Sequence, residues 1–219
     1  MSATRLLLVD DDPLVRSGLR LLLGGSPEVV IVGEAGDGDG VVAAVRATRP
    51  DVVLMDLRMH RVDGVRATRL VRALPDPPHV LVLTTFDTDE EVLGALRAGA
   101  AGYLLKDTPP EELLRAVRAV TAGDAVLSPA VTRTVIGRIR ERRAPSADRT
   151  RRLAGLPDGE RRVARAVARG LSNAEIAAEL HLSPATVKAY VSRALTALDL
   201  TNRVQLALLV AEADDDAGA

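Results

Sequence analysis

The sequence contains no cysteine and no tryptophan, and it has only one phenylalanine and two tyrosines. Without cysteine the chain can form no disulfide framework and offers no thiolate to a metal, which agrees with a reducing compartment. Hydrophobic residues make up 47% of the chain but aromatic residues only 1%. The core must therefore be built from leucine, valine, isoleucine and alanine, a composition that suits helices and buried parallel strands.

Long apolar runs are absent as well. The longest, such as Leu6–Val9, are far shorter than the ~20 residues that a membrane span needs. The N-terminal segment reaches Asp10 too early to contain the apolar region of a secretory signal. We therefore expect a soluble cytoplasmic protein without membrane contact.

Lysine is scarce, because Lys106 and Lys188 stand beside 27 arginines. The net charge of −1 also conceals an uneven distribution. Residues 1–127 hold 14 basic and 19 acidic residues, residues 128–211 hold 15 and 7, and residues 212–219 add four acids. A basic module of this kind suggests a polyanionic partner for the second half, and a solvated basic face is the alternative explanation.

The first ~125 residues alternate short continuous apolar runs with segments of helical periodicity. Continuous runs are typical of strands that are buried on both faces of a sheet. The strict alternation predicts a doubly wound α/β domain with a five-stranded parallel sheet. The expected strands are Leu6–Val9, Val29–Val32, Val52–Met55, Val80–Leu83 and Gly102–Leu105, and the expected helices are 14–23, 40–47, 64–73, 89–98 and 110–122.

The remainder of the chain predicts a small all-α domain with four helices. We expect residues 1–124 to form the first domain, 125–152 a trailing helix (125–140) and a linker (141–152), and 153–213 the second domain, followed by an acidic tail at 214–219. The linker contains almost no apolar side chain. The four helices are expected near 158–169, 173–180, 184–198 and 202–212.

Polar residues follow four of the five expected strands. Ligands bind at the carboxyl ends of the strands in open parallel sheets, so these residues should gather at one edge. Clustered carboxylates repel one another unless a cation is present, and oxygen ligands suit Mg²⁺. A carboxylate beside Mg²⁺ can accept a phosphoryl group as an aspartyl phosphate. The residues at the strand ends are Asp10-Asp11-Asp12, Asp56, Thr84-Thr85 and Lys106.

Lys106 is a lysine in a chain that otherwise uses arginine. A compact ammonium group on a flexible stem reaches a small site as a point charge, whereas a planar guanidinium needs several acceptors and more room. This difference predicts that Lys106 serves the acidic site.

These residues resemble the receiver domain of two-component response regulators, a flavodoxin-like fold. The resemblance covers residues 4–122 and rests on Asp10-Asp11, "DVVLMDLRM", "LVLTTFD" and "GYLLKD". It implies that Asp56 accepts a phosphoryl group from the phosphohistidine of a partner kinase and that Lys106 pairs with this group. It further implies that Thr84 and Tyr103 form the switch. The implied Mg²⁺ ligands are Asp10, Asp11, Asp56 and the backbone carbonyl of Arg58.

Two positions depart from the pattern of the family. His60 stands where a proline commonly follows the methionine of the phosphoacceptor loop, so we expect a less rigid loop. Asp12 stands where this subfamily often has histidine, and the extra acid is expected to alter metal affinity. We expect His60 to be an exposed loop residue and not a ligand.

The segment "LSNAEIAAELHLSPATVKAYVSRAL" reads as helix, turn, helix, with Ser183 as N-cap and Pro184 in the first turn. One stripe of the second helix is apolar and the opposite stripe is small and polar with cations. Small residues allow close approach to base edges, and Lys or Arg can contact guanine or phosphate in the major groove. An ordinary amphipathic helix is the alternative interpretation.

Residues 156–210 resemble the LuxR-type helix-turn-helix through Glu160, "RGLSNAEIAAEL", "LSPATVKAYVSR" and "NRVQLALL". The whole chain thus resembles response regulators of the NarL/FixJ type. The resemblance implies a homodimer on double-stranded, pseudo-palindromic DNA, with helix 202–212 as the dimer contact. The residues implied to face DNA are Thr186, Lys188, Ala189, Ser192 and Arg193.

The predicted function is therefore a phosphorylation-controlled transcription regulator and not an enzyme, with Mg²⁺ as cofactor and a sensor histidine kinase as partner. One alternative is a Mg²⁺-dependent phosphohydrolase that uses Asp56 as nucleophile, although Arg58 occupies the position where such enzymes commonly place a general acid. Another is an adaptor that works without phosphorylation.

Overall fold

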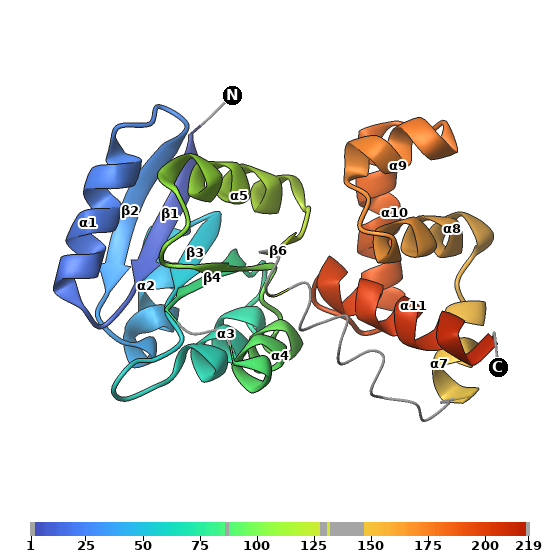
Figure 1. The fold of residues 1–219 in the computed structure, drawn as a ribbon, viewed down its shortest axis with the longest axis horizontal. Helices are drawn as coiled ribbons and strands as arrows, with labels where there is room; N and C mark the ends of the chain where they lie inside the picture. Colours follow the sequence, from blue (N-terminus) through green and yellow to red (C-terminus); the bar gives the residue numbers. More distant parts are fainter. Residues whose placement is uncertain (1–2, 86–87, 128–130, 132–146, 218–219) are drawn as a thin grey trace. The chain divides into compact units, whose positions relative to one another are not determined.

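A computed structural model describes residues 3–85, 88–127, 131 and 147–217 of the chain. The chain divides into two compact units, residues 1–132 and residues 133–219. The first is an α/β unit and the second is helical (Figure 1). Among the described residues, no helix combines the length and apolar character that a membrane crossing requires.

The first unit is built on a parallel sheet of six strands in the order β2-β1-β3-β4-β5-β6. The five predicted strands are present at or within a few residues of their expected ends. The sixth strand, β6, lies where the sequence predicts the start of the trailing helix 125–140, so that prediction is wrong for these two residues. The strands are β1 (Thr4–Val9), β2 (Val29–Ala35), β3 (Val52–Met55), β4 (His79–Thr84), β5 (Gly102–Leu105) and β6 (Val126–Leu127).

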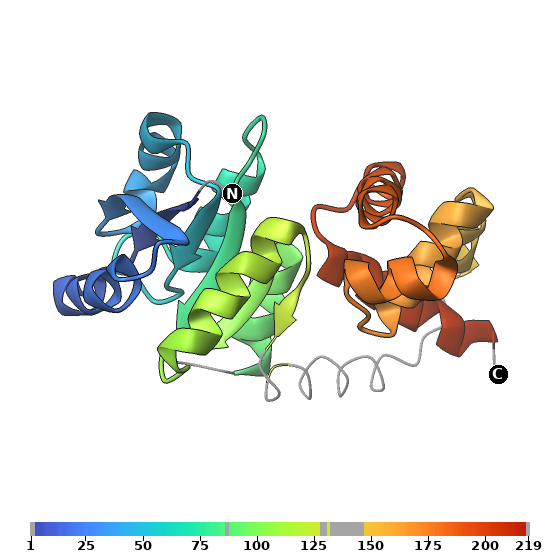
Figure 2. The same cartoon turned by 90° about the horizontal axis from the view of Figure 1, so that it is seen from above.

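Helices cover both faces of this sheet (Figures 1 and 2). All five predicted helices of the unit are present, and a short 3-10 helix, η1 (Gly38–Gly40), precedes the second. They are α1 (Pro13–Gly24), α2 (Val41–Thr48), α3 (Gly64–Arg72), α4 (Asp89–Ala98) and α5 (Pro110–Ala122).

The alternation of side chains along the buried strands divides the core into two layers. Leu6 and Leu8 of β1 pack in one apolar cluster with Leu113 and Val117 of α5. Leu7 of β1 packs in the other cluster, with residues of α2 and α3. Because successive side chains of a strand point to opposite faces, strands buried on both sides require continuous apolar runs.

The described residues of the second unit form five helices, one more than predicted. The additional helix, α7 (Ala147–Ala154), begins within the predicted linker, and its Leu153 is buried in the core of this unit. The other four are α8 (Asp158–Ala168), α9 (Asn173–Leu180), α10 (Pro184–Ala197) and α11 (Arg203–Ala217). The first four residues of the predicted acidic tail continue α11. Most of the predicted trailing helix lies outside the described residues.

Candidate phosphoacceptor site and nucleic-acid interface

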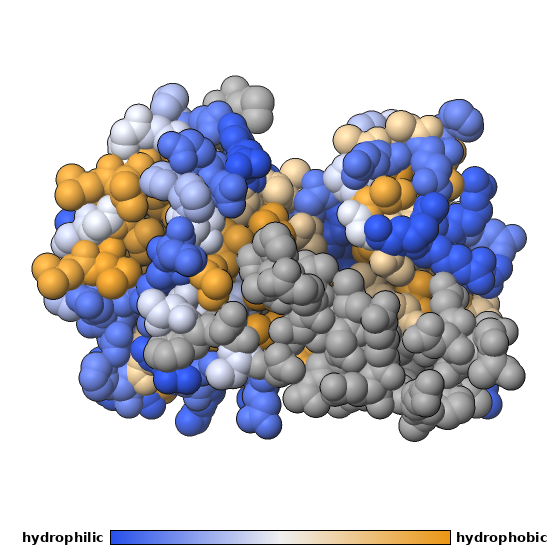
Figure 3. All heavy atoms as spheres, in the orientation of Figure 1, coloured by the Kyte–Doolittle hydropathy of each residue, from blue (hydrophilic) through white to orange (hydrophobic). Residues whose placement is uncertain are grey.

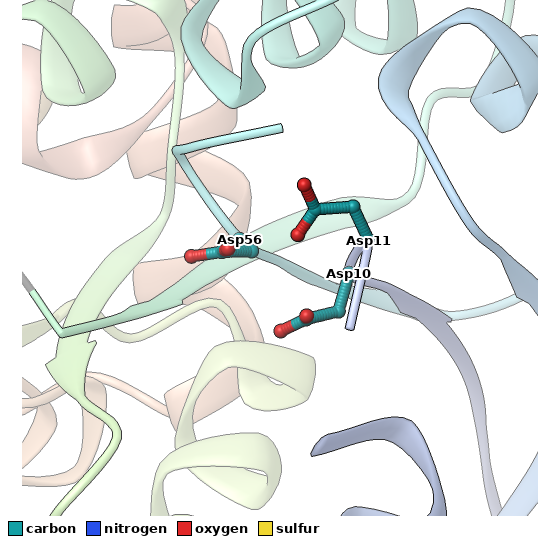
Figure 4. Close-up of side chains that lie close together, drawn as sticks. All are labelled: Asp10, Asp11 and Asp56. Atoms are coloured by element: carbon teal, nitrogen blue, oxygen red, sulfur yellow. The ribbon is translucent and has the colours of Figure 1, made fainter. Parts of the chain in front are cut away.

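Three carboxylates meet at the carboxyl edge of the sheet (Figure 4). Asp10 follows β1 and Asp56 follows β3, and these strands are neighbours in which Val9 pairs with Met55. The backbone N–H of Asp56 donates to the carbonyl of Val9 at 2.8 Å, which fixes the two strand ends side by side. Carboxylate oxygens of Asp10, Asp11 and Asp56 lie within 4.8 Å of one another.

Lys106 follows β5, and its side chain reaches across β4 to the carboxylates at the ends of β1 and β3. Its ammonium nitrogen lies 2.6 Å from an Asp10 oxygen and 3.3 Å from an Asp56 oxygen. Its backbone N–H donates to the carbonyl of Thr84 at 2.8 Å, so the end of β5 is tied to the end of β4. The structure therefore brings the predicted acids and the predicted lysine into one site.

Burial controls the electrostatics of this site. Desolvation raises the pKa of Asp56, the nearby Asp10 carboxylate raises it further, and the Lys106 ammonium opposes both. Burial alone would lower the pKa of Lys106, but its hydrogen bond to Asp10 and the charge of Asp56 hold that pKa above the usual value. Lys106 is thus a fixed positive charge at neutral pH, held against two buried carboxylates.

The two predicted switch residues are enclosed in the same half of the sheet. Thr84 ends β4 and is fully buried, and its hydroxyl has no hydrogen-bond partner among the described residues. Tyr103, in β5, is also fully buried. A buried hydroxyl without a partner is unusual in folded proteins, and it leaves a donor for an incoming group.

The structure gives definite places to the two unusual residues of the sequence. Asp12 is the N-cap of α1, since its carboxylate accepts the N–H of Leu14 at 2.8 Å. Its side chain belongs to a helix start and is not a member of the acidic cluster. His60 is 85% exposed, as expected, but its Nδ1 contacts the carboxylate of Asp11.

Arg58 lies two residues after Asp56, in the loop between β3 and α3. Its guanidinium donates to Glu91 of α4 at 2.9 Å, and Thr88 donates to the other oxygen of the same carboxylate at 2.6 Å. Burial tends to raise the pKa of Glu91, but the hydrogen bonds from Arg58 and Thr88 outweigh it and hold that pKa below its usual value. The side chain of Arg58 therefore connects the loop to α4.

The donor set of the cluster fits Mg²⁺. Among the described residues three carboxylates converge, and carboxylate oxygens are the donors that Mg²⁺ prefers. A hard cation that keeps several waters suits such an incomplete shell better than a transition metal does.

Two supporting residues were missed by the sequence interpretation. Asp37, after β2, is buried and accepts backbone N–H groups of Arg61 and Val62. Gly64 packs so closely that a Cβ there would lie 2.0 Å from the carbonyl oxygen of Asp56. The Asp37-Gly38 pair is a common turn sequence, so its local pattern gives no sign of the distant loop that it contacts.

Hydrogen bonds at the helix starts define the helix-turn-helix of the second unit. Ser172 and Glu175 form a capping box at the start of α9. Ser183 accepts the N–H of Thr186 at 3.0 Å and caps α10, with Pro184 in the first turn. His181 adopts a left-handed backbone with a φ of 55°, which turns the chain between the two helices.

The predicted recognition stripe of α10 is exposed. Lys188, Ala189, Ser192 and Arg193 are exposed, and Thr186 is half-buried with its hydroxyl bonded to Ser183. Val187, Val191 and Ala194, on the opposite side of the helix, are buried in the core. The helix is therefore amphipathic, with its small and basic face toward solvent.

The two cations of α10 differ in their surroundings. Lys188 has no ion-pair partner among the described residues. Arg193 donates to the carboxylate of Glu160 in α8 at 2.7 Å, and its guanidinium lies 4.7 Å from the ring centre of Tyr190. Glu160 is itself buried, so Arg193 also anchors α10 to α8.

The predicted dimer helix is α11, and much of it is buried within its own unit. Val204, Leu206, Leu209 and Val210 are buried, and α11 packs against α7 and α8. Arg203, at its start, is buried and donates to Asn173 and to the carbonyl of Leu171. The partly exposed residues among those described are Gln205, Ala207, Leu208 and Ala211.

Comparisons with known proteins agree with this division of the chain. Residues 6–118 match the model of the response regulator receiver domain, and residues 155–210 match that of bacterial regulatory proteins of the luxR family. The DNA-binding transcriptional activator DevR/DosR of Mycobacterium tuberculosis is 39% identical over 209 residues, covering 95% of this chain and 94% of its own. The nitrate/nitrite response regulator protein NarL of Escherichia coli is 35% identical over 205 residues, covering 94% of each chain.

Solved structures give the same result. The response regulator ChrA of a heme-sensing two-component system shares 35% sequence identity, covers 98% of each chain and has a TM-score of 0.54. The RcsB–DNA complex covers 96% of this chain with a TM-score of 0.57, and at 23% identity it supports the fold alone. The chain therefore belongs to the response regulators that join a receiver domain to a LuxR-type DNA-binding domain.

Proposed function

We propose that Asp56 accepts a phosphoryl group from the phosphohistidine of a sensor histidine kinase and that this modification controls DNA binding by the second unit. The observation that carries the proposal is the convergence of Asp10, Asp11 and Asp56 with Lys106 at one strand edge. A carboxylate oxygen of Asp56 forms the new bond to phosphorus while the N–P bond breaks, and the imidazole of the donor keeps the electron pair.

Asp10, Asp11, Asp56 and the backbone carbonyl of Arg58 would hold Mg²⁺. When bound, Mg²⁺ supplies positive charge against the oxygens of the transferred group. Lys106 supplies a second, permanent positive charge to the same oxygens, and its compact head fits between Asp10 and Asp56. Because the ammonium group of Lys106 already lies against Asp56, it can stabilise the transition state without rearrangement.

The phosphorylated state differs from the free state in charge and in hydrogen-bond acceptors. The unpartnered hydroxyl of Thr84 is a donor for the new phosphoryl oxygens. If Thr84 moves toward them, the space that it leaves allows Tyr103 to reorient, so these two residues form the switch. The altered surface of the first unit then changes dimerisation and DNA binding.

In the second unit, α10 would enter the major groove. Its exposed face is small and basic, and we assign DNA contact to Thr186, Lys188, Ala189, Ser192 and Arg193. The partly exposed residues of α11 would form the contact of a homodimer, which then reads a pseudo-palindromic site. A cytoplasmic location would agree with a kinase donor and a DNA target.

A phosphohydrolase is less well supported by the same site. Such an enzyme would need a general acid near Asp56, and the residue two positions later is Arg58, whose guanidinium donates to Glu91 and does not give up its proton. A lasting phosphoryl group on Asp56 fits this arrangement better than repeated hydrolysis of phosphate esters.

The test is labelling of the full chain with acetyl phosphate in the presence of Mg²⁺, followed by a DNA-binding assay. We expect labelled wild-type protein to change its DNA affinity and Asp56→Asn to show neither labelling nor change. Asp51→Asn is the control, because Asp51 precedes the same strand at its opposite end, where its carboxylate accepts the backbone N–H of Arg5. Labelling that persists in Asp56→Asn would refute the assignment.

A further inference from the structure

The loop between β3 and α3 starts at the phosphoacceptor and contains the backbone carbonyl that we assign to Mg²⁺. This loop lacks the proline that is common in the family after Met59, so its conformation must be held in another way. Its first N–H, that of Leu57, donates to the Asp56 carboxylate at 2.9 Å. The N–H of Gly64, at its end, donates to the carbonyl of Leu57 at 2.8 Å.

The central part of the loop is held from outside by Asp37. Each carboxylate oxygen of Asp37 accepts one backbone N–H at 2.9 Å, Oδ2 from Arg61 and Oδ1 from Val62. Asp37 is only 3% exposed and comes from the segment after β2, on the other side of β1. Charge-assisted hydrogen bonds from two successive N–H groups fix the orientation of both peptide planes.

The backbone beside Asp37 also touches the loop directly. A Cβ on Gly38 would lie 2.3 Å from the carbonyl oxygen of Val62 and 3.0 Å from Cβ of Ala67. The loop is thus held from two directions, by the hydrogen bonds that its N–H groups donate to Asp37 and by close packing at Gly38. A side chain at position 38 would displace it.

We propose that Asp37 is a positioning residue for the metal site, which holds the loop so that the carbonyl of Arg58 is presented to the acidic cluster. The proposal rests on the proposed function, since Arg58 is a ligand only if Mg²⁺ binds there. Asp37 acts through the backbone and touches neither the metal nor the phosphoryl group.

Asp39 provides a matched control. It lies two residues from Asp37, and both carboxylates face the guanidinium of Arg61, that of Asp39 at 3.0 Å and that of Asp37 at 3.7 Å. Asp39 is 40% exposed and, among the described contacts, it receives no hydrogen bond from the loop backbone. Comparing Asp37→Asn with Asp39→Asn therefore separates backbone anchoring from the loss of one negative charge.

The experiment measures Mg²⁺ binding to the full chain by calorimetric titration, together with acetyl phosphate labelling over a range of Mg²⁺ concentrations. Supporting residues around a metal typically change its affinity 10- to 100-fold, so we expect Asp37→Asn to raise the half-saturating Mg²⁺ concentration roughly tenfold. Asp39→Asn should stay within about twofold of wild type because its contact is solvent-exposed. Labelling of Asp37→Asn at saturating Mg²⁺ should approach that of wild type.

The outcomes are distinct. If Asp37 has a purely structural role, Asp37→Asn lowers the amount of active protein but leaves the half-saturating Mg²⁺ concentration of the folded protein unchanged. That result overturns the inference. Absence of Mg²⁺ binding in wild type overturns both the metal site and the inference. Weaker binding in Asp37→Asn without labelling of either protein supports the inference and overturns the phosphoacceptor role. If Asp37→Asn does not fold, Asp37→Glu, which shifts the carboxylate by one methylene, must show the same loss of affinity.

Discussion

In the first unit charged side chains converge on one buried point, whereas on α10 they are spread over an exposed face. Asp10 and Asp56 are 3% and 6% exposed and share Lys106. Lys188 stands in solvent. Charges in a buried cluster are coupled to one another and little screened by salt, while exposed charges act independently and are screened. The two regions should therefore respond to mutation, salt and pH in different ways.

The largest effect is expected from removing the central cation of the buried cluster. Lys106→Ala leaves Asp10 and Asp56 without their positive partner, so we expect phosphorylation by acetyl phosphate to slow by roughly 10²- to 10³-fold. The first unit should also lose about 2 kcal/mol of stability, less than for a fully buried pair because Lys106 is 18% exposed. Labelling kinetics and hydrogen exchange in β1 and β3 measure the two effects.

Lys106→Arg keeps the charge and changes the shape of the head group. We expect Lys106→Arg to recover most of the stability that Lys106→Ala loses but less of the phosphorylation rate, because a planar guanidinium does not fit the point between two carboxylates. Equal phosphorylation rates in Lys106→Arg and wild type would contradict the geometric argument.

The second effect concerns the exposed face. Lys188→Ala should weaken DNA binding about tenfold at low salt and reduce the slope of log K against log salt by about one, because one phosphate contact is lost. Arg193→Ala should weaken DNA binding and, unlike Lys188→Ala, should also destabilise the second unit, since Glu160 would lose its partner. Titrations at several salt concentrations and thermal unfolding distinguish the two variants. The same DNA affinity, salt slope and thermal stability in both variants would show that Arg193 does not anchor α10 to α8.

A smaller effect is expected at the start of α10. Ser183→Ala removes the acceptor for the N–H of Thr186 and should lower the stability of the second unit by about 1 kcal/mol. Ser192→Ala, on the exposed face of the same helix, is the control and should change stability by less than about 0.5 kcal/mol. Hydrogen exchange at the first turn of α10 reports the difference, and protection unchanged in Ser183→Ala would speak against the cap.

The smallest effect is a change in the pH dependence of stability. Burial tends to raise the pKa of Asp37, but the N–H groups of Val62 and Arg61 outweigh it and hold the pKa below its usual value. Folding thus favours the charged form of Asp37. Its contribution to the stability of the folded protein is complete above the unfolded pKa of about 3.9 and is lost as the pH falls through the pKa of the folded state. As the pH falls from about 5 to about 3, the free energy of unfolding should fall less in Asp37→Asn than in wild type. Parallel urea titrations test this, and equal losses would contradict it.

Much of the fold was predictable because its determinants are local. The strands of the first unit are continuous apolar runs between helical segments, and their positions follow from burial on both faces. The sixth strand was missed because Val126–Leu127 is two residues long and only half-buried. The helix α7 was missed because most of its residues are polar, and among its described side chains only Leu153 is buried.

The candidate site was predictable for a related reason. Its residues follow strand ends, and a parallel sheet brings strand ends together whatever the sequence distance between them. The contacts that support the site were not predictable. Asp37 meets Val62 and Arg193 meets Glu160 across loops and helices, and nothing in the local pattern specifies such pairs. Their discovery required the three-dimensional structure.

The scarcity of aromatic residues has a practical consequence. Each unit contains a single tyrosine, Tyr103 fully buried in the first and Tyr190 beside a guanidinium in the second. Uniform labelling with fluorotyrosine would therefore give two ¹⁹F resonances, one from each half of the protein. A spectrum recorded during phosphoryl transfer or DNA titration would report separately on the interior of one unit and the surface of the other, without any engineered label.

The surface of the first unit carries exposed leucines on α1. Apolar side chains gather over α1 (Figure 3), where Leu14 and Leu21 are 80% and 83% exposed. Site-specific ¹³C labelling of these leucine methyl groups would add a reporter on the surface of the first unit to the two fluorine signals.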